Sequence, residues 1–158
     1  MNKKILLLED DMLLAQTLSE LLEFEAYDVT LVSSGGEAAD VVYGSKFDLY
    51  IFDINVPDMN GLELLESLRS ADDKTPTIFI SALVDLNSIS KAFKVGADDY
   101  IKKPFFPEEL LIRINAKLLS HSSIILYNNL EYDPQTKILK KDSKVLSLGK
   151  VQERLFDL

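Results

Sequence analysis

The chain has 158 residues, 47% of them hydrophobic, which is enough for one packed domain and part of a second. Its 26 acidic and 17 basic residues give a net charge of −9, which disfavours broad electrostatic attraction to nucleic acid or anionic lipid. No apolar run is long enough to span a membrane and no signal-peptide core is visible, so a cytoplasmic location without a membrane partner is expected.

Along residues 1–119 the apolar residues switch repeatedly between short continuous runs and helical spacing, which is typical of βα units. Strands are expected at about residues 4–8, 27–32, 49–53, 77–81 and 100–101. A helix is expected after each, around the apolar residues of segments 14–22, 38–42, 62–68, 89–93 and 110–118. Gly96 is expected to cap the end of the fourth helix, and Pro107 to begin the fifth. Five βα units predict an α/β fold with a doubly wound sheet of five parallel strands.

The pattern changes after Leu119. Residues 120–123 are polar and are expected to form a linker. Residues 124–158 contain β-rich segments separated by tight-turn sequences, which predict the start of a second, antiparallel domain. Val151, Leu155 and Leu158 then stand at helical spacing, which predicts the start of a helix that a longer protein would continue.

Four of the expected parallel strands run into polar or charged residues. Asp53 closes the third strand, and Glu9 and Asp10 follow the first. Ser81 ends the fourth strand, and Lys103 follows the fifth. Because the carboxyl ends of parallel strands lie along one edge of a sheet, these side chains are expected to converge there.

Three carboxylates brought together in this way need compensation, since two like charges 4 Å apart repel by about 4 kcal/mol at an effective dielectric near 20. Mg²⁺ supplies it, because it binds one or two carboxylates together with phosphate oxygens. Asp53 can then act as a nucleophile toward a phosphoryl group, with Lys103 and the Ser81 hydroxyl contacting the incoming oxygens. Plainer roles exist for single residues, and Asp11 is expected simply to cap the following helix.

Together these segments resemble the receiver domain of two-component response regulators. The resemblance covers about residues 1–120 and is carried by Leu8-Glu9-Asp10, by Asp53 with Pro57 and Gly61, by Ser81-Ala82, and by residues 96–105. It implies a flavodoxin-like strand order of 2-1-3-4-5. Residues 124–158 are similar to the amino-terminal β platform and first helix start of a winged-helix output domain of the OmpR/PhoB type.

The resemblance implies that Asp53 accepts phosphate from a sensor histidine kinase. Asp10, Asp53 and the carbonyl of Asn55 would bind Mg²⁺, and Glu9 would act through metal-bound water. The protein would then regulate transcription rather than act as a metabolic enzyme. DNA would be contacted only through the part of the output domain that is missing from these 158 residues.

The resemblance also assigns a switch and a dimer face. Ser81 and Tyr100 take the hydroxyl and aromatic positions of the switch, with Tyr100 turning into the space that Ser81 leaves after phosphorylation. A homodimer would form on phosphorylation through the fourth helix, fifth strand and fifth helix, whose mixed charges can be self-complementary about a twofold axis. Because Ile89 stands where a second basic residue is common, apolar contacts are expected to contribute more than charge pairs. The expected face consists of Ile89, Lys91, Phe93, Asp98, Asp99, Glu109, Leu111 and Arg113.

Three other functions fit parts of the pattern. A phosphatase of the haloacid dehalogenase type would need a second acid where this chain has Asn55. A flavodoxin-like cofactor carrier would hold a phosphate at the first loop, which the acids at 9–11 would repel without a metal. A receiver that works without phosphorylation as a protein-interaction module stays open as the alternative.

Overall fold

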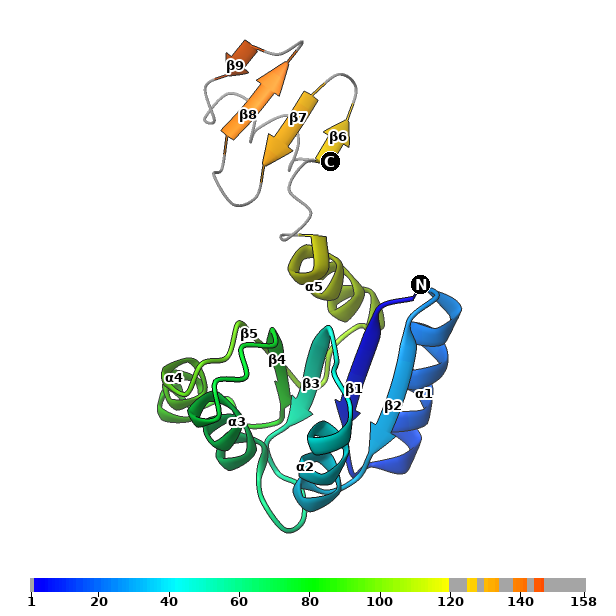
Figure 1. The fold of residues 1–158 in the computed structure, drawn as a ribbon, viewed down its shortest axis with the longest axis vertical. Coiled ribbons are helices and arrows are strands. Elements are labelled where there is room, and N and C mark those ends of the chain that lie inside the picture. Colours follow the sequence, from blue (N-terminus) through cyan, green and yellow to red (C-terminus); the bar gives the residue numbers. More distant parts are fainter. Residues whose placement is uncertain (1, 120–124, 128–129, 134–137, 142–143, 147–158) are drawn as a thin grey trace. The chain divides into compact units, whose positions relative to one another are not determined.

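The five expected βα units form one parallel sheet in the computed structural model (Figure 1). The structure describes residues 2–119, 125–127, 130–133, 138–141 and 144–146. The strand order is β2-β1-β3-β4-β5, as the resemblance implies. In chain order the elements of the sheet and its helices are β1 (Lys4–Leu8), α1 (Met12–Phe24), β2 (Asp28–Val32), α2 (Gly35–Gly44), β3 (Leu49–Asp53), α3 (Gly61–Ser70), β4 (Thr77–Ser81), α4 (Leu86–Lys94), β5 (Asp99–Lys102) and α5 (Pro107–Leu119).

Short polar side chains set where these helices begin. Asp11, Ser34, Asn60 and Asp85 each accept a hydrogen bond from a free amide in the first turn of α1, α2, α3 and α4 respectively. The capping role expected for Asp11 is therefore confirmed. α5 instead begins at Pro107, as expected, where a missing amide costs the helix nothing.

Three of these helices end in the same way. Ala26, Asp72 and Gly96 follow the ends of α1, α3 and α4, with φ angles of 67°, 66° and 112°. In each case the next amide donates to the carbonyl five residues earlier, which is the Schellman arrangement. The cap expected at Gly96 is confirmed. The other two residues carry a Cβ atom in the left-handed region, where glycine is the usual residue.

The sheet is buried on both faces. Alternate strand residues such as Leu6 and Phe52 pack with α2, α3 and α4 in one core cluster. The residues between them, such as Ile5 and Ile51, are equally buried, as are the inward faces of α1 and α5. With helices on both faces, the carboxyl edge is where side chains from several strands can meet a ligand.

The chain divides into two compact units, Met1–Ile114 and Asn115–Leu158, and α5 continues across this boundary. The second unit contains a four-stranded antiparallel sheet in the order β6-β7-β8-β9, as the β-rich pattern predicts. The expected linker 120–123 and the helix start at Val151, Leu155 and Leu158 lie outside the described residues. Within the described part of the chain, no helix has the length and apolarity needed to cross a membrane. The four strands are β6 (Ile125–Tyr127), β7 (Leu130–Asp133), β8 (Ile138–Lys141) and β9 (Lys144–Leu146).

Candidate functional site

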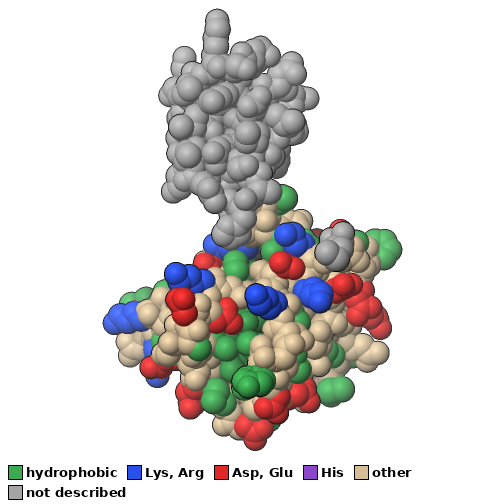
Figure 2. Space-filling model, in the orientation of Figure 1, with side chains coloured by type: hydrophobic (Ala, Val, Ile, Leu, Met, Phe, Trp, Pro, Cys, Tyr) green, Lys and Arg blue, Asp and Glu red, His purple; other side chains and the backbone are tan. Residues whose placement is uncertain are grey.

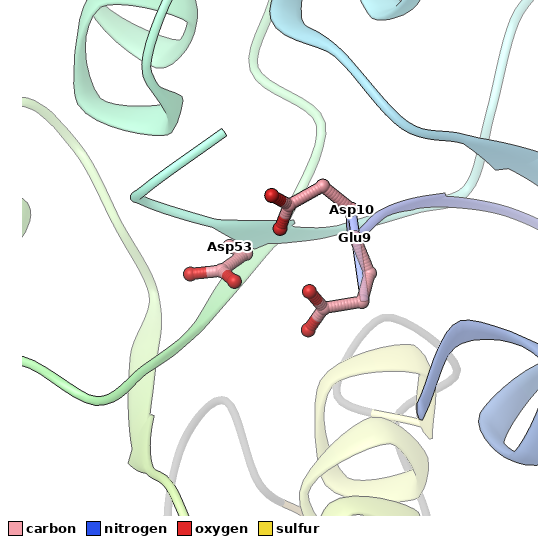
Figure 3. A group of neighbouring side chains, drawn as sticks. All are labelled: Glu9, Asp10 and Asp53. Atoms are coloured by element: carbon pink, nitrogen blue, oxygen red, sulfur yellow. The ribbon is translucent and has the colours of Figure 1, made fainter. Parts of the chain in front are cut away.

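Three acids meet at the carboxyl ends of β1 and β3 (Figure 3). These strands are neighbours, with Leu8 paired to Phe52, so the residues that follow β1 face the end of β3. Glu9, Asp10 and Asp53 each offer one carboxylate oxygen, and the three atoms lie within 4.8 Å of one another. Glu9 and Asp53 are 1% and 5% exposed, whereas Asp10 is exposed to solvent. The expected convergence of the acids is therefore present in the structure.

Lys103 joins two of these acids. Its Nζ donates to Glu9 Oε1 at 2.6 Å and to Asp53 Oδ2 at 2.8 Å. The Lys103 amide donates to the Ser81 carbonyl at 2.8 Å, which holds the residue beside the end of β4, and the following peptide bond to Pro104 is cis. One ammonium group therefore bridges carboxylates that belong to two different strand ends.

The pKa values of Glu9 and Lys103 are both shifted at this site. Burial raises the pKa of Glu9 to about 7, and the charge of Asp53 adds to the increase. Hydrogen bonds from Lys103 and from the Asp11 amide, which lies 3.1 Å from Glu9 Oε2, only partly offset that increase. For Lys103, burial lowers the pKa, but the hydrogen bonds to Asp53 and Glu9 outweigh it and the net change is upward. Lys103 therefore stays charged at neutral pH.

The donor set at this edge fits Mg²⁺. All three acids supply hard oxygen ligands, which Mg²⁺ prefers. Lys103 neutralises only part of their charge, and exposed Asp10 leaves one side open to water and ligand. Asn55, the further ligand implied by the resemblance, is exposed next to the site, and its amide donates to Asp53 Oδ1 at 3.3 Å. In Figure 1, β1 and β3 run toward the lower margin of the unit that contains the parallel sheet. Figure 2 shows Asp and Glu side chains along this margin.

Ser81 and Tyr100, expected to form the switch, both form hydrogen bonds with the backbone of Leu83. Ser81 is fully buried, and its Oγ accepts from the Leu83 amide at 3.1 Å. The Tyr100 hydroxyl donates to the Leu83 carbonyl at 2.7 Å. Burial is the main reason why the pKa of Tyr100 is raised, and Ser81 offsets that increase in part.

Tyr100 already lies inward in this structure. The residue is 8% exposed, and its ring contacts Phe79, with ring centroids 6.5 Å apart. With Ser81 in place, ring packing and the hydroxyl's hydrogen bond already hold Tyr100 inward, so its turn into the space that Ser81 would leave stays a prediction. The contact with Phe79 ends a row of neighbouring rings formed by Phe47, Tyr50, Phe52, Phe79 and Tyr100.

Charged residues of the expected dimer face are paired within the chain. Arg113 donates to Asp99 at 2.7 Å and to Glu109 at 3.2 Å. The hydrogen bond to Asp99 is the main reason why the pKa of Arg113 is raised. Asp98 accepts from the Thr77 amide at 2.8 Å.

The remaining residues of that face differ in exposure. Lys91 is exposed, and Phe93 is 46% exposed. Ile89 and Leu111 are half-buried, and Ile89 packs partly against the core cluster. The structure therefore leaves Phe93 as the most exposed apolar member of the expected face.

Arg69 forms a polar network that sequence reasoning missed. It donates to the Gly96 carbonyl at 2.9 Å and to the Asp73 carbonyl at 2.8 Å, and it lies 3.5 Å from Asp98. The only sequence signal is a basic residue in the last turn of the helix 61–70, which does not indicate the partner. The network joins α3 to the turn before β5.

Together the fold and the site define a receiver-type α/β protein, with acids and a lysine at the carboxyl edge of a flavodoxin-like sheet. The family described as response regulator receiver domain matches residues 5–115. The transcriptional regulatory protein CrdR of Helicobacter pylori is 37% identical over 147 residues, covering 92% of this chain and 68% of CrdR.

Two solved structures are similar in fold. A CheY-like receiver domain protein of Methanospirillum hungatei has a TM-score of 0.72 and 35% identity, covering 75% of this chain and 94% of that one. The response regulator DrrB, an OmpR/PhoB homologue of Thermotoga maritima, has a TM-score of 0.69 and 27% identity, covering 98% of this chain and 70% of DrrB. The chain belongs to the response regulator receiver family and is a two-component response regulator of the OmpR/PhoB type. Membership places it in signalling and transcription control rather than in metabolic catalysis.

Proposed function

We propose that Asp53 accepts a phosphoryl group from the phosphohistidine of a sensor histidine kinase. The observation that carries this proposal is the bridge from Lys103 to Glu9 and Asp53 beside exposed Asp10. A structural ion pair would need only one carboxylate. Three acids around one lysine leave negative charge uncompensated. A bound cation can neutralise that charge while it also contacts the oxygens of a phosphoryl group.

In the proposed reaction a carboxylate oxygen of Asp53 attacks the phosphorus atom. The bond from phosphorus to the kinase imidazole breaks, and its electron pair stays on the imidazole nitrogen, so charge and atoms balance. Lys103 contacts the transferring oxygens, and the Ser81 hydroxyl donates to one of them. Asp10, Asp53 and the Asn55 carbonyl would hold Mg²⁺, with Glu9 acting through its water. Bound there, Mg²⁺ would neutralise the charge on the phosphoryl oxygens.

Labelling with a small phosphodonor tests the acceptor. Wild type incubated with acetyl phosphate and Mg²⁺ should gain one phosphoryl group by intact-mass analysis, and Asp53→Asn should gain none. Asp40→Asn, an exposed acid on α2, is the matched control and should be labelled like wild type. Equal labelling of Asp53→Asn rejects the assignment. An unlabelled wild type favours the phosphorylation-independent interaction module instead.

We further propose that phosphorylation promotes a twofold homodimer through α4, β5 and α5. Arg113, Asp99 and Glu109 are already paired within one chain, so new charge pairs would replace existing ones and add little. Phe93, with Ile89 beside it, supplies apolar area that dimerisation would bury.

Sedimentation with and without beryllofluoride tests this face. Wild type should shift to dimer when the acyl phosphate is mimicked, and Phe93→Asp should not. Phe24→Asp is the control, because Phe24 is 87% exposed at the end of α1, outside the proposed face. An unchanged mass on activation, or a Phe93→Asp variant that dimerises like wild type, would show that another surface is used.

We assign the receiver to residues 1–119, the linker to 120–123 and the output region to 124–158. The antiparallel strands β6 to β9 and the 98% coverage by DrrB support an output domain of the winged-helix type in the last of these segments. Its target would be DNA, since CrdR is named a transcriptional regulatory protein. A cytoplasmic location, where such a regulator would meet both kinase and DNA, remains a prediction.

A further inference from the structure

The loop between β3 and α3 follows the proposed phosphoacceptor directly, and backbone hydrogen bonds close it. The amides of Val56 and Gly61 both donate to the Ile54 carbonyl, at 3.1 and 2.9 Å. Asn55, whose carbonyl is a proposed Mg²⁺ ligand, lies inside this closed turn. The direction of that carbonyl therefore depends on what holds the rest of the loop.

The first residue of α2 touches the middle of the loop. The Gly35 amide donates to the Pro57 carbonyl at 3.1 Å. A Cβ atom on Gly35 would lie 1.9 Å from the Met59 carbonyl oxygen and 2.7 Å from its carbonyl carbon. Both are backbone atoms, which cannot rotate away as the end of a side chain can. A side chain at this position would therefore force the loop and the helix apart.

The helix is the better anchored of the two partners. Ser34 Oγ accepts from the Glu37 amide at 3.1 Å, and the Glu37 carboxylate accepts in return from the amide before the cap at 3.0 Å. Gly35 is itself buried, whereas Pro57 and Asp58 of the loop are exposed. An added side chain would therefore displace the loop, and with it the backbone around Asn55.

We propose that Gly35 is a positioning residue for the cation site. By carrying no side chain, it lets the start of α2 brace the loop that presents the Asn55 carbonyl beside Asp53. The inference rests on the proposed Mg²⁺-assisted phosphoacceptor function. It adds a residue that is outside the site and 18 positions earlier in the chain than Asp53.

Calorimetric titration with Mg²⁺ tests the role of Gly35 without relying on phosphorylation. Gly35→Ala should bind Mg²⁺ at least about tenfold more weakly than wild type, the lower range for losing a group that orients a metal ligand. Gly44→Ala makes the same chemical change at the last residue of the same helix, where no atom lies within 4 Å of the new Cβ. That variant should bind like wild type.

Gly36→Ala separates backbone crowding from a general effect at the start of the helix. The three atoms nearest its Cβ would all belong to the Asp58 side chain, with Oδ2 at 3.1 Å, and that carboxylate can rotate. Mg²⁺ affinity should therefore stay close to that of wild type. A loss equal to that of Gly35→Ala would overturn the proposal, because the Met59 backbone would then not be the cause.

Urea unfolding in EDTA gives the folded fraction of each variant, so that affinity is expressed per folded molecule. If Gly35→Ala does not fold, the same change is made in an Asp58→Gly background. Asp58 has a φ angle of 70°, which glycine adopts without strain, so that background gains stability and serves as its own reference.

If Gly35→Ala binds Mg²⁺ as tightly as wild type, the inference is overturned while the proposed function stays intact. The same holds if Gly35→Ala made in the Asp58→Gly background binds as tightly as Asp58→Gly alone. If wild type itself binds no Mg²⁺, the proposed function fails and the inference fails with it.

Discussion

Replacing Asp10 by asparagine should stabilise the metal-free protein above pH 7, where Glu9 is charged, because it removes one of three like charges at the carboxyl edge of the sheet. One oxygen from each acid lies within 4.8 Å of the others. Two charges at that distance repel by about 3.5 kcal/mol at a dielectric near 20 and by about 0.9 kcal/mol in water. Asp10 is exposed and Lys103 partly neutralises its neighbours, so the free energy of unfolding should rise by about 1 kcal/mol.

Mg²⁺ should reverse the order of stability. A cation that binds only the folded protein raises the free energy of unfolding by about 1.4 kcal/mol when its free concentration is about ten times Kd. Wild type should gain this stabilisation in full. Asp10→Asn has lost a carboxylate ligand and should gain much less.

Urea unfolding followed by circular dichroism, first in EDTA and then in Mg²⁺, measures both effects. Asp40→Asn controls for removing one acid from a chain of net charge −9 and should show neither effect. If Asp10→Asn is less stable than wild type in EDTA, the charge-crowding argument is wrong. If Mg²⁺ stabilises both proteins equally, Asp10 is not a ligand.

Three further changes test other parts of the structure. Ala26→Gly should raise the free energy of unfolding by about 0.5–1 kcal/mol in chemical denaturation, because a residue with Cβ at φ 67° is strained, whereas Ala39→Gly inside α2 should lower it. Tyr50→Phe should lower the free energy of unfolding by about 1.5–3 kcal/mol, since the buried Tyr50 hydroxyl donates to the Asp73 carboxylate at 2.5 Å. Tyr43 is 96% exposed, so Tyr43→Phe should not change the free energy of unfolding measurably. In EDTA, folding favours protonated Glu9, so the free energy of unfolding should fall as pH rises from 4.5 through about 7. Glu9→Gln should lack this component of the pH dependence. A Glu9→Gln profile parallel to that of wild type would contradict the raised pKa of Glu9.

Local pattern in the sequence was sufficient to predict the five βα units, the positions of the strand ends and the acids that meet there. Periodicity reports which element a segment forms and which face it buries, and parallel strands bring their carboxyl ends to one edge whatever packs around them. Asp53, Glu9 and Asp10 could therefore be chosen before their distances were known. Gly96 was recognisable as a cap because glycine is the common residue there.

Other features depend on hydrogen bonds that the residue types alone do not indicate. Ala26 and Asp72 adopt left-handed backbone although neither is glycine, because each helix end must satisfy its carbonyls before the chain turns. Asp98 accepts from the Thr77 amide 21 residues earlier, and the Tyr100 hydroxyl donates to the Leu83 carbonyl 17 residues earlier. No local signal predicts such partners.

The tertiary structure also decided the electrostatics and the bracing of the site. Glu9 and Lys103 are 94 residues apart in sequence, and only their burial together determines that Glu9 titrates near neutrality while Lys103 stays charged. Gly35 gains its proposed role from the Met59 backbone, whose carbonyl oxygen would lie 1.9 Å from a Cβ atom at this position, and helix propensity cannot report such a neighbour. Burial and close packing depend on distances between elements, whereas sequence periodicity describes each element alone.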